Sequence, residues 1–289
     1  MKFLGIYFTG TGNTKRVIDN AKAAFISFGH SLDEVDVIGG EVKDLNEYDG
    51  LFISYPIYGF NAPKPIIDYV KKINKLDKQI PCLIMKQSGE HLFWNNASSL
   101  YLTSLLKKRN IIVKNEYHYL MPYSFIFRHT DYMAYRMNNV MEHLIPMDME
   151  DFLNGKEVHL KRFFLDRFFA WVLRIQWWGG RFNGRFYKVE SKKCIKCLKC
   201  VNDCPVKNIV FDKEKGKFKF KGQCLMCQRC IMYCPRQAIK VGMFNSWRVD
   251  VPYTFKEAEY QKEKHPNYCK KSYIRYFAES EKRIAESQK

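Results

Sequence analysis

Two runs of cysteines, thirty positions apart, decide how the C-terminal part of this chain folds. The first run reads Cys194-Ile-Lys-Cys197-Leu-Lys-Cys200-Val-Asn-Asp-Cys204-Pro205, and the second reads Cys224-Leu-Met-Cys227-Gln-Arg-Cys230-Ile-Met-Tyr-Cys234-Pro235. A constant offset between all four pairs of cysteines indicates an internal duplication. Three thiolates separated by two residues each can bind three corners of one [4Fe–4S] cubane, and the proline turns the chain away after the fourth cysteine.

The spacing resembles that of bacterial ferredoxins, in which the fourth cysteine of each run binds the other cluster. The resemblance implies two [4Fe–4S] clusters with these ligand sets: Cys194, Cys197, Cys200 and Cys234; and Cys224, Cys227, Cys230 and Cys204. A pair of zinc sites is the main alternative, but structural zinc uses paired Cys-x-x-Cys units, which leave the third cysteine of each run without a role. A disulfide framework needs an oxidising compartment. The N-terminus, Met1-Lys2-Phe3-Leu4, shows no secretory signal, so we expect a reducing interior.

Composition bounds the possible partners. The chain has 289 residues, 46% of them hydrophobic, a formal net charge of +18 and a pI near 9.4. This charge predicts attraction to acidic proteins, nucleic acid or an anionic membrane face, without selecting among them. The sequence contains no uncharged apolar run of roughly twenty residues, so no ordinary membrane span is expected.

The N-terminal part begins with a strand, a Gly/Thr turn and a helix. Apolar and small residues alternate over 2–8, and this stretch leads into Thr9-Gly10-Thr11-Gly12-Asn13-Thr14. Apolar residues then recur at helical spacing as far as Gly29. Backbone N–H groups, threonine hydroxyls and a positive helix end together form a phosphate-binding loop. The Walker and Rossmann patterns are both absent, so the loop suits a phosphate monoester such as that of FMN.

The run Ile6-Tyr7-Phe8-Thr9-Gly10-Thr11-Gly12-Asn13-Thr14 resembles the FMN-phosphate signature of flavodoxins. An ordinary glycine-rich turn is the alternative. Further strands are expected over 34–38, 51–55, 80–86 and 111–121, with helices over 65–76 and 96–108 and a last helix containing 133–145. This alternation predicts an α/β, doubly wound, five-stranded parallel sheet with ligands at the carboxyl ends of its strands.

Two loops follow the strands expected over 51–55 and 80–86. In flavodoxins the corresponding loops hold the flavin ring, which makes these residues candidates: Pro56, Ile57, Tyr58, Gly59, Phe60, Asn61, Ser88 and Gly89. Tyr58 is the preferred stacking residue, followed by Trp94 and Tyr123, although each could be an ordinary loop or core aromatic. His91 and His129 flank this region and are expected to be structural. Cys82, in an apolar strand, is expected to be a buried small hydrophobe.

The segment 161–178 is rich in aromatic and basic residues. As one helix it places Phe164, Phe168, Trp171, Ile175 and Trp178 on one face. This pattern suits a helix that lies in a membrane interface or docks into a groove on a partner, and the alternative is that the helix packs between the two domains. Gly179-Gly180 and Gly184 are expected to form a hinge.

Two further segments have expected roles. A lysine-rich hairpin is expected over 210–221, turning near Gly216, as a solvated edge and secondarily as a docking patch for an acidic partner. The polar tail is expected to be loosely attached, with some helix and with Cys269 as a free thiol.

The chain resembles bacterial fusions of a flavodoxin with a small α+β ferredoxin carrying two [4Fe–4S] clusters. The motifs that carry the resemblance cover most of the chain, but the basic aromatic helix and the tail match no motif. The expected organisation is a flavodoxin-like domain (1–155), a connecting helix (156–185), a ferredoxin domain (186–245) and a tail (246–289). The resemblance implies an electron carrier, in the cytoplasm or peripheral at the inner membrane face, that works with acidic redox partners and binds no nucleic acid. One alternative is a flavin-dependent oxidoreductase with its own substrate, such as a quinone. The other is a zinc- or cluster-stabilised module that binds nucleic acid or lipid. The sequence shows no clear acid–base constellation near the flavin loops, which favours the carrier.

Overall fold

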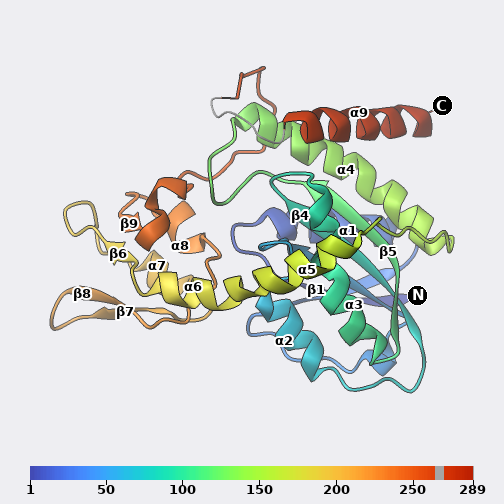
Figure 1. The fold of residues 1–289 in the computed structure, drawn as a ribbon, viewed down its shortest axis with the longest axis horizontal. Coiled ribbons are helices and arrows are strands. Elements are labelled where there is room, and N and C mark those ends of the chain that lie inside the picture. Colours follow the sequence, from blue (N-terminus) through green and yellow to red (C-terminus); the bar gives the residue numbers. More distant parts are fainter. Residues whose placement is uncertain (264–269, 289) are drawn as a thin grey trace.

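The computed structural model describes residues 1–263 and 270–288, and a parallel β-sheet organises the N-terminal half (Figure 1). Its strands are β1 (Lys2–Tyr7), β2 (Ser31–Asp36), β3 (Gly50–Pro56), β4 (Ile80–Ser88) and β5 (Ile111–Leu120). The strand order is β2-β1-β3-β4-β5, with every neighbouring pair parallel. This is the flavodoxin-like doubly wound order. The fold class expected from the sequence is therefore confirmed.

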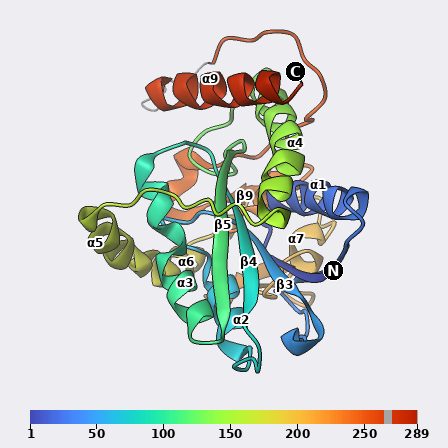
Figure 2. The same cartoon turned by 90° about the vertical axis from the view of Figure 1, so that its right-hand side faces the viewer.

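Helices cover both faces of this sheet (Figure 2). One face packs against α1 (Asn13–Ser27) and α4 (Asp131–Leu153), and the other against α2 (Lys64–Lys72) and α3 (Leu100–Lys107). Each face buries its own apolar cluster because side chains alternate along the strands. The helix expected to contain 133–145 is α4, and Cys82 is fully buried in β4, as expected.

Several element boundaries differ from the sequence expectation, among them those of β2, α2 and α3. β2 ends at Asp36 because its carboxylate accepts the N–H of Ile38 and turns the chain. α2 stops at Lys72, and the Arg109 Nε donates to the carbonyl of the next residue. The segment before α3 forms a 3₁₀ helix, η2 (Phe93–Ser99); a second short 3₁₀ helix, η1 (Leu45–Glu47), precedes β3.

The cysteine-rich domain is built from very short elements. They are β6 (Lys188–Val189), α7 (Lys199–Asn202), β7 (Ile209–Asp212), β8 (Lys217–Phe220), α8 (Arg229–Met232), β9 (Ile239–Lys240) and η4 (Gly242–Trp247). Antiparallel β7 and β8 form the expected lysine-rich hairpin, with Gly216 at φ 60° in its turn. Non-glycine residues with positive φ recur thirty positions apart in three pairs: Lys196 and Met226, Leu198 and Gln228, and Lys207 and Gln237. The duplication therefore extends to the backbone conformation.

Three helical segments connect the two halves: α5 (Phe164–Val172), η3 (Leu173–Ile175) and α6 (Gln176–Gly184). The expected glycine hinge is wrong, because Gly179, Gly180 and Gly184 all lie within α6. Gly184 is needed for close packing instead. A Cβ there would lie 2.2 Å from the Cβ of Cys224.

The expectation of a loosely attached tail is also wrong. Helix α9 (Lys270–Ser287) packs along α4, and Tyr273, Tyr276 and Phe277 are buried in the core on that face of the sheet. Apolar side chains at helical spacing among charged ones explain this docking. Cys269 lies outside the described residues. Within the described parts of the chain, no helix is both long and apolar enough to cross a membrane.

Candidate redox site

A cavity of about 580 Å³ lies where four strands of the sheet, β1, β3, β4 and β5, end, and the cysteine-rich domain closes one side of it. The Gly/Thr turn after β1, the loops after β3 and β4, and helix α6 all contribute to its wall. Ligands of doubly wound sheets bind at this edge. A cavity of this size is sufficient for a cofactor-sized molecule.

Hydrogen bonds within the turn and to neighbouring loops hold the Gly/Thr turn in place. The Thr9 Oγ1 accepts the N–H of Gly12 at 3.0 Å, the Asn13 amide donates to the carbonyl of Pro122 at 2.8 Å, and the Thr14 hydroxyl donates to Gln87 at 3.0 Å. Gly12 has φ 100° at the start of α1, a conformation that a side chain would strain. The cavity is lined by Thr9, Gly10, Thr11, Asn13 and Thr14; Gly12 lies outside the lining.

Most of the expected ring-binding residues line the same cavity: Pro56, Ile57, Tyr58, Gly59, Phe60, Ser88 and Gly89. Asn61 does not. Its buried amide donates to the carbonyls of Gly59 and Ala170, at 2.9 and 2.8 Å, and so ties this loop to α5. Gly59 and Phe60 both have positive φ, which explains the tight turn.

Of the three aromatic residues expected to stack on a flavin, two line the cavity and one does not. Tyr58 lines the cavity with its ring edge-on to Phe8, and burial raises the pKa of its phenol well above 10. Tyr123 also lines the cavity. Trp94 does not, and stacks on Phe169 with ring centroids 4.7 Å apart. The sequence reasoning missed Trp177, which reaches the cavity from α6.

His91 and His129 do not line the cavity. His129 is buried and stacks on Tyr123, which agrees with the structural role expected for it. His91 stacks on His118 with centroids 4.8 Å apart. The His118 Nε2 lies 2.7 Å from the hydroxyl of Ser88, a cavity residue, so the histidine pair, with His118 buried and His91 partly buried, supports this wall. Its burial lowers the pKa of both imidazoles.

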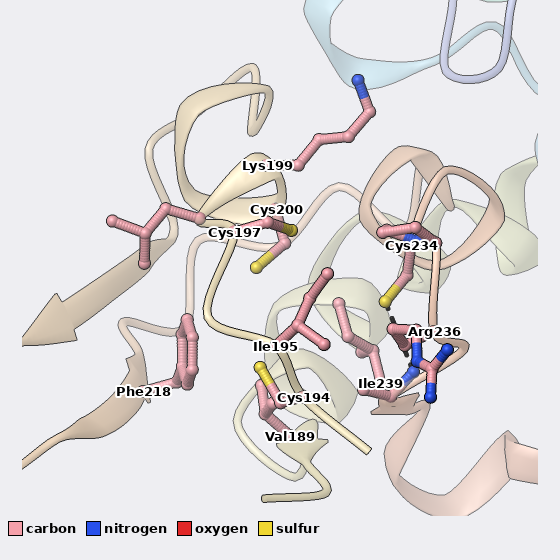
Figure 3. Close-up of a pocket in the computed structure, with 13 residues that line it drawn as sticks. Val189, Cys194, Ile195, Cys197, Lys199, Cys200, Phe218, Cys234, Arg236 and Ile239 are labelled. Atoms are coloured by element: carbon pink, nitrogen blue, oxygen red, sulfur yellow. Dashed lines mark hydrogen bonds between the residues drawn. The ribbon is translucent and has the colours of Figure 1, made fainter.

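The first four-cysteine set borders a small cavity of its own. Figure 3 shows Cys194, Cys197, Cys200 and Cys234 around a common space. Apolar side chains from Val189, Ile195, Phe218 and Ile239 complete the wall. The cysteines that the ferredoxin resemblance assigns to one cluster are thus brought together.

The second set, Cys204, Cys224, Cys227 and Cys230, borders another small cavity. Backbone N–H groups donate to the cysteine sulfurs at equivalent places in the two motifs. Lys196 and Met226 donate to Cys194 and Cys224 at 3.4 and 3.3 Å. The N–H groups of Asn208 and Ala238 bond the fourth cysteine of each run, at 3.2 and 3.3 Å. In the described chain, no three His, Cys, Asp or Glu side chains converge tightly enough for a single metal ion.

The second cysteine loop lies directly against the Gly/Thr turn. A Cβ on Gly10 would lie 2.2 Å from the carbonyl oxygen of Cys227, so the two backbones are in contact. Arg229 donates to the carbonyls of Gly10 and Thr9, at 2.9 and 2.8 Å. The hydroxyl of Tyr233 donates to the carbonyl of Thr11 at 2.6 Å. Cys224 and Cys227 consequently line the large cavity.

Comparison with known proteins agrees with this division. Residues 193–238 match the family model described as a 4Fe-4S dicluster domain. Subunit I of the NAD(P)H-quinone oxidoreductase of Gloeobacter violaceus is 35% identical over 71 residues, which cover 21% of this chain and 34% of that protein. This chain therefore spans about a third of the length of the curated relative that it matches.

Solved flavodoxins align with the other half. A flavodoxin from the domain Archaea covers 52% of this chain and 98% of its own, with 11% identity and a TM-score of 0.38. A short-chain flavodoxin associated with a bacterial microcompartment covers 54% and 99%, with 13% identity and a TM-score of 0.41. The strand order identifies the flavodoxin-like sheet independently of these scores. The chain thus joins a flavodoxin-like fold to a 4Fe-4S dicluster domain.

Proposed function

We propose that this protein carries electrons between an FMN in the large cavity and two [4Fe–4S] clusters on the cysteine-rich domain. The observation that supports this most strongly is the junction of the two halves. The phosphate-type turn and the loop of Cys224 and Cys227 line the same cavity and touch at Gly10. Bound FMN would exchange one or two electrons, whereas each cluster would exchange one.

The residues present fit these groups. The turn offers threonine hydroxyls, glycine backbone and the positive end of α1 for a phosphate. The loops after β3 and β4 offer backbone groups and Tyr58 for a flavin ring. Eight cysteines in the matched dicluster segment supply four thiolates to each cluster.

The junction also supports an order for the two cluster sites. Cys224 and Cys227 line the flavin cavity, whereas the set that includes Cys194 and Cys197 borders a separate one. We therefore infer that the Cys204/224/227/230 site exchanges electrons with the flavin and that the other site exchanges them with a partner. Cys197 is exposed at that outer site, which gives a partner access.

The surroundings of the outer site are basic. Exposed lysines at positions 192, 193, 196 and 199 lie in or just before the first cysteine motif, and the β7–β8 hairpin adds Lys217 and Lys219. Positive surface charge steers acidic partners and accelerates their association. An acidic redox protein is accordingly the partner class that we propose.

A flavin-dependent oxidoreductase with its own substrate is a second candidate, and one feature of the cavity favours it. Beyond the loops expected to hold a flavin, the wall contains Phe182, Met243 and Phe244. An apolar section of this kind suits a flat hydrophobic substrate such as a quinone. Turnover of a quinone by the purified protein, without any protein partner, would distinguish this candidate from the carrier.

The proposal is tested on anaerobically purified protein by its absorption spectrum and by assays of iron, sulfide, zinc and flavin. About eight irons, as many sulfides and one FMN per chain are expected for two cubanes and one flavin. Zinc without sulfide, or protein that binds no flavin after incubation with FMN, would contradict it. Replacement of Cys197 with Ser should then affect one cluster and leave the flavin content unchanged.

A further inference from the structure

The helices that connect the two halves turn small and polar residues toward the protein and bulky apolar residues toward solvent, the opposite of an ordinary amphipathic surface helix. Small or polar residues face the protein, among them Asp166, Ala170, Gly180, Asn183 and Gly184, all of which are buried. Six large apolar residues face outward instead. We call these six residues the outer face: Leu165, Phe168, Trp171, Val172, Ile175 and Trp178. The Phe164 side chain is not among those described.

The outer face is extensively exposed. Trp171, Ile175 and Trp178 are 63%, 69% and 63% exposed, respectively. The helices do bridge the two halves, as the alternative expectation for this segment had it, but they do so through their small residues. The apolar stripe is left uncovered. Contiguous exposed apolar patches on soluble proteins mark interaction sites.

The exposed charged residues of the segment 161–188 have one sign. Exposed basic residues lie within these helices or within a few residues of their ends, at Lys161, Arg167, Arg181, Arg185 and Lys188. Asp166 is the single acidic residue of the segment 161–188, and it is buried at the start of α5, where its carboxylate accepts the N–H of Phe163. The exposed surface of these helices is therefore aromatic and aliphatic with cationic edges and no anionic group among residues 161–188.

We propose that the outer face binds an anionic phospholipid surface, with α5 and α6 lying in the plane of the interface. Tryptophan and phenylalanine on one side of a helix with Lys and Arg beside them are characteristic of interfacial helices. α5 lies at the edge of the molecule, away from the sheet (Figure 2), so a flat surface can reach it. Anionic lipid complements the cationic edges and the net charge of +18.

This placement has a consequence for the cavity. α6 presents Trp178 outward while its neighbour Trp177 and Gly180 line the flavin cavity. A membrane bound at the outer face therefore lies one helix away from the cavity. The membrane proposal itself does not depend on the function proposed above, because it requires only the folded chain.

The test is flotation of the purified holoprotein with vesicles. Vesicles of phosphatidylcholine with about 30% of the anionic lipid phosphatidylglycerol should carry the protein. Vesicles of pure phosphatidylcholine should carry much less of it. The triple variant Trp171→Gln, Ile175→Gln, Trp178→Gln should reduce the partition coefficient at least about tenfold, because glutamine keeps the helix and removes the apolar contact. Ile26→Gln with Ile274→Gln is the matched control, since both are about as exposed but lie on other helices.

Depth of insertion provides a second readout. Brominated lipids should quench tryptophan fluorescence in the wild-type protein and quench it less in the triple variant. Failure of well-folded wild-type protein to float with anionic vesicles at low salt would overturn the proposal. So would equal flotation of the wild type and the triple variant, or the finding that the variant loses a stable dimer or an acidic protein partner instead of lipid binding.

Discussion

Arg229 provides the most direct test of how the two halves are joined. Its guanidinium donates to the carbonyls of Gly10 and Thr9, at 2.9 and 2.8 Å, across the junction. Hydrogen bonds that involve a charged group contribute about 1.5–3 kcal/mol each. Arg229→Gln keeps at most one donor in reach, so we expect docking of α8 on the Gly/Thr turn to weaken by about 2–3 kcal/mol. The open population should then rise about 30- to 150-fold.

Native-state hydrogen exchange of the holoprotein measures this population. Under conditions where exchange reports the equilibrium open fraction, amides of the turn at 9–14 and of the loop at 224–230 should lose protection by that factor. Electron transfer between flavin and clusters, followed after rapid reduction, should slow in parallel. Protection in the middle of the sheet should not change.

The duplication supplies the control for this experiment. Lys199 occupies the position thirty residues before Arg229, in the other cysteine motif, and pairs with Asp203 at 3.0 Å on the surface. Lys199→Gln removes the same charge beside a cluster site without touching the junction. Unchanged protection in Arg229→Gln, or an equal loss in Lys199→Gln, would refute the reasoning.

Three further predictions follow from packing and titration. Gly184→Ala places a methyl group 2.2 Å from the Cβ of a ligand-set cysteine, so iron and sulfide per chain should fall, whereas Gly179→Ala, with nothing within 4 Å, should retain both. Normal iron content in Gly184→Ala would contradict the close packing. Phe277→Ala empties a buried position of α9 and should lower the free energy of unfolding in urea by about 3–5 kcal/mol, whereas the exposed Ile274→Ala should change it by under about 0.5 kcal/mol; a loosely attached α9 would make the two variants alike. Burial lowers the pKa of His91 from 6.5 to about 4. Because the unfolded chain then binds more protons, the wild type should lose on the order of 2–3 kcal/mol as the pH falls from 6.5 through 4. Thermal melts of His91→Phe should show a smaller loss over that window, and parallel curves would disprove this contribution.

Local chemistry explains what could be predicted from the sequence alone. Cysteine spacing limits which thiolates can surround one cluster, and the strand–turn–helix of residues 2–27 is encoded by neighbouring residues. The alternation of strand and helix segments restricts the topology to very few sheets. The parallel sheet, the Gly/Thr loop and the two cysteine sets could therefore be predicted from the sequence alone.

Only the tertiary structure decided which of the two cysteine motifs contacts the Gly/Thr turn and which way the apolar stripe faces. In sequence the two cysteine motifs are near copies, and packing distinguishes them by placing Cys227, not Cys197, against Gly10. Helical periodicity indicates an apolar stripe on 161–178, but the direction of that stripe depends on which neighbours fit. Small residues at 180 and 184 allow α6 to approach the cysteine loop closely, so the bulky face turns to solvent. The sequence by itself determined the local motifs, because nearby residues encode them. The tertiary structure decided their mutual placement, because that depends on shape complementarity between segments far apart in the chain.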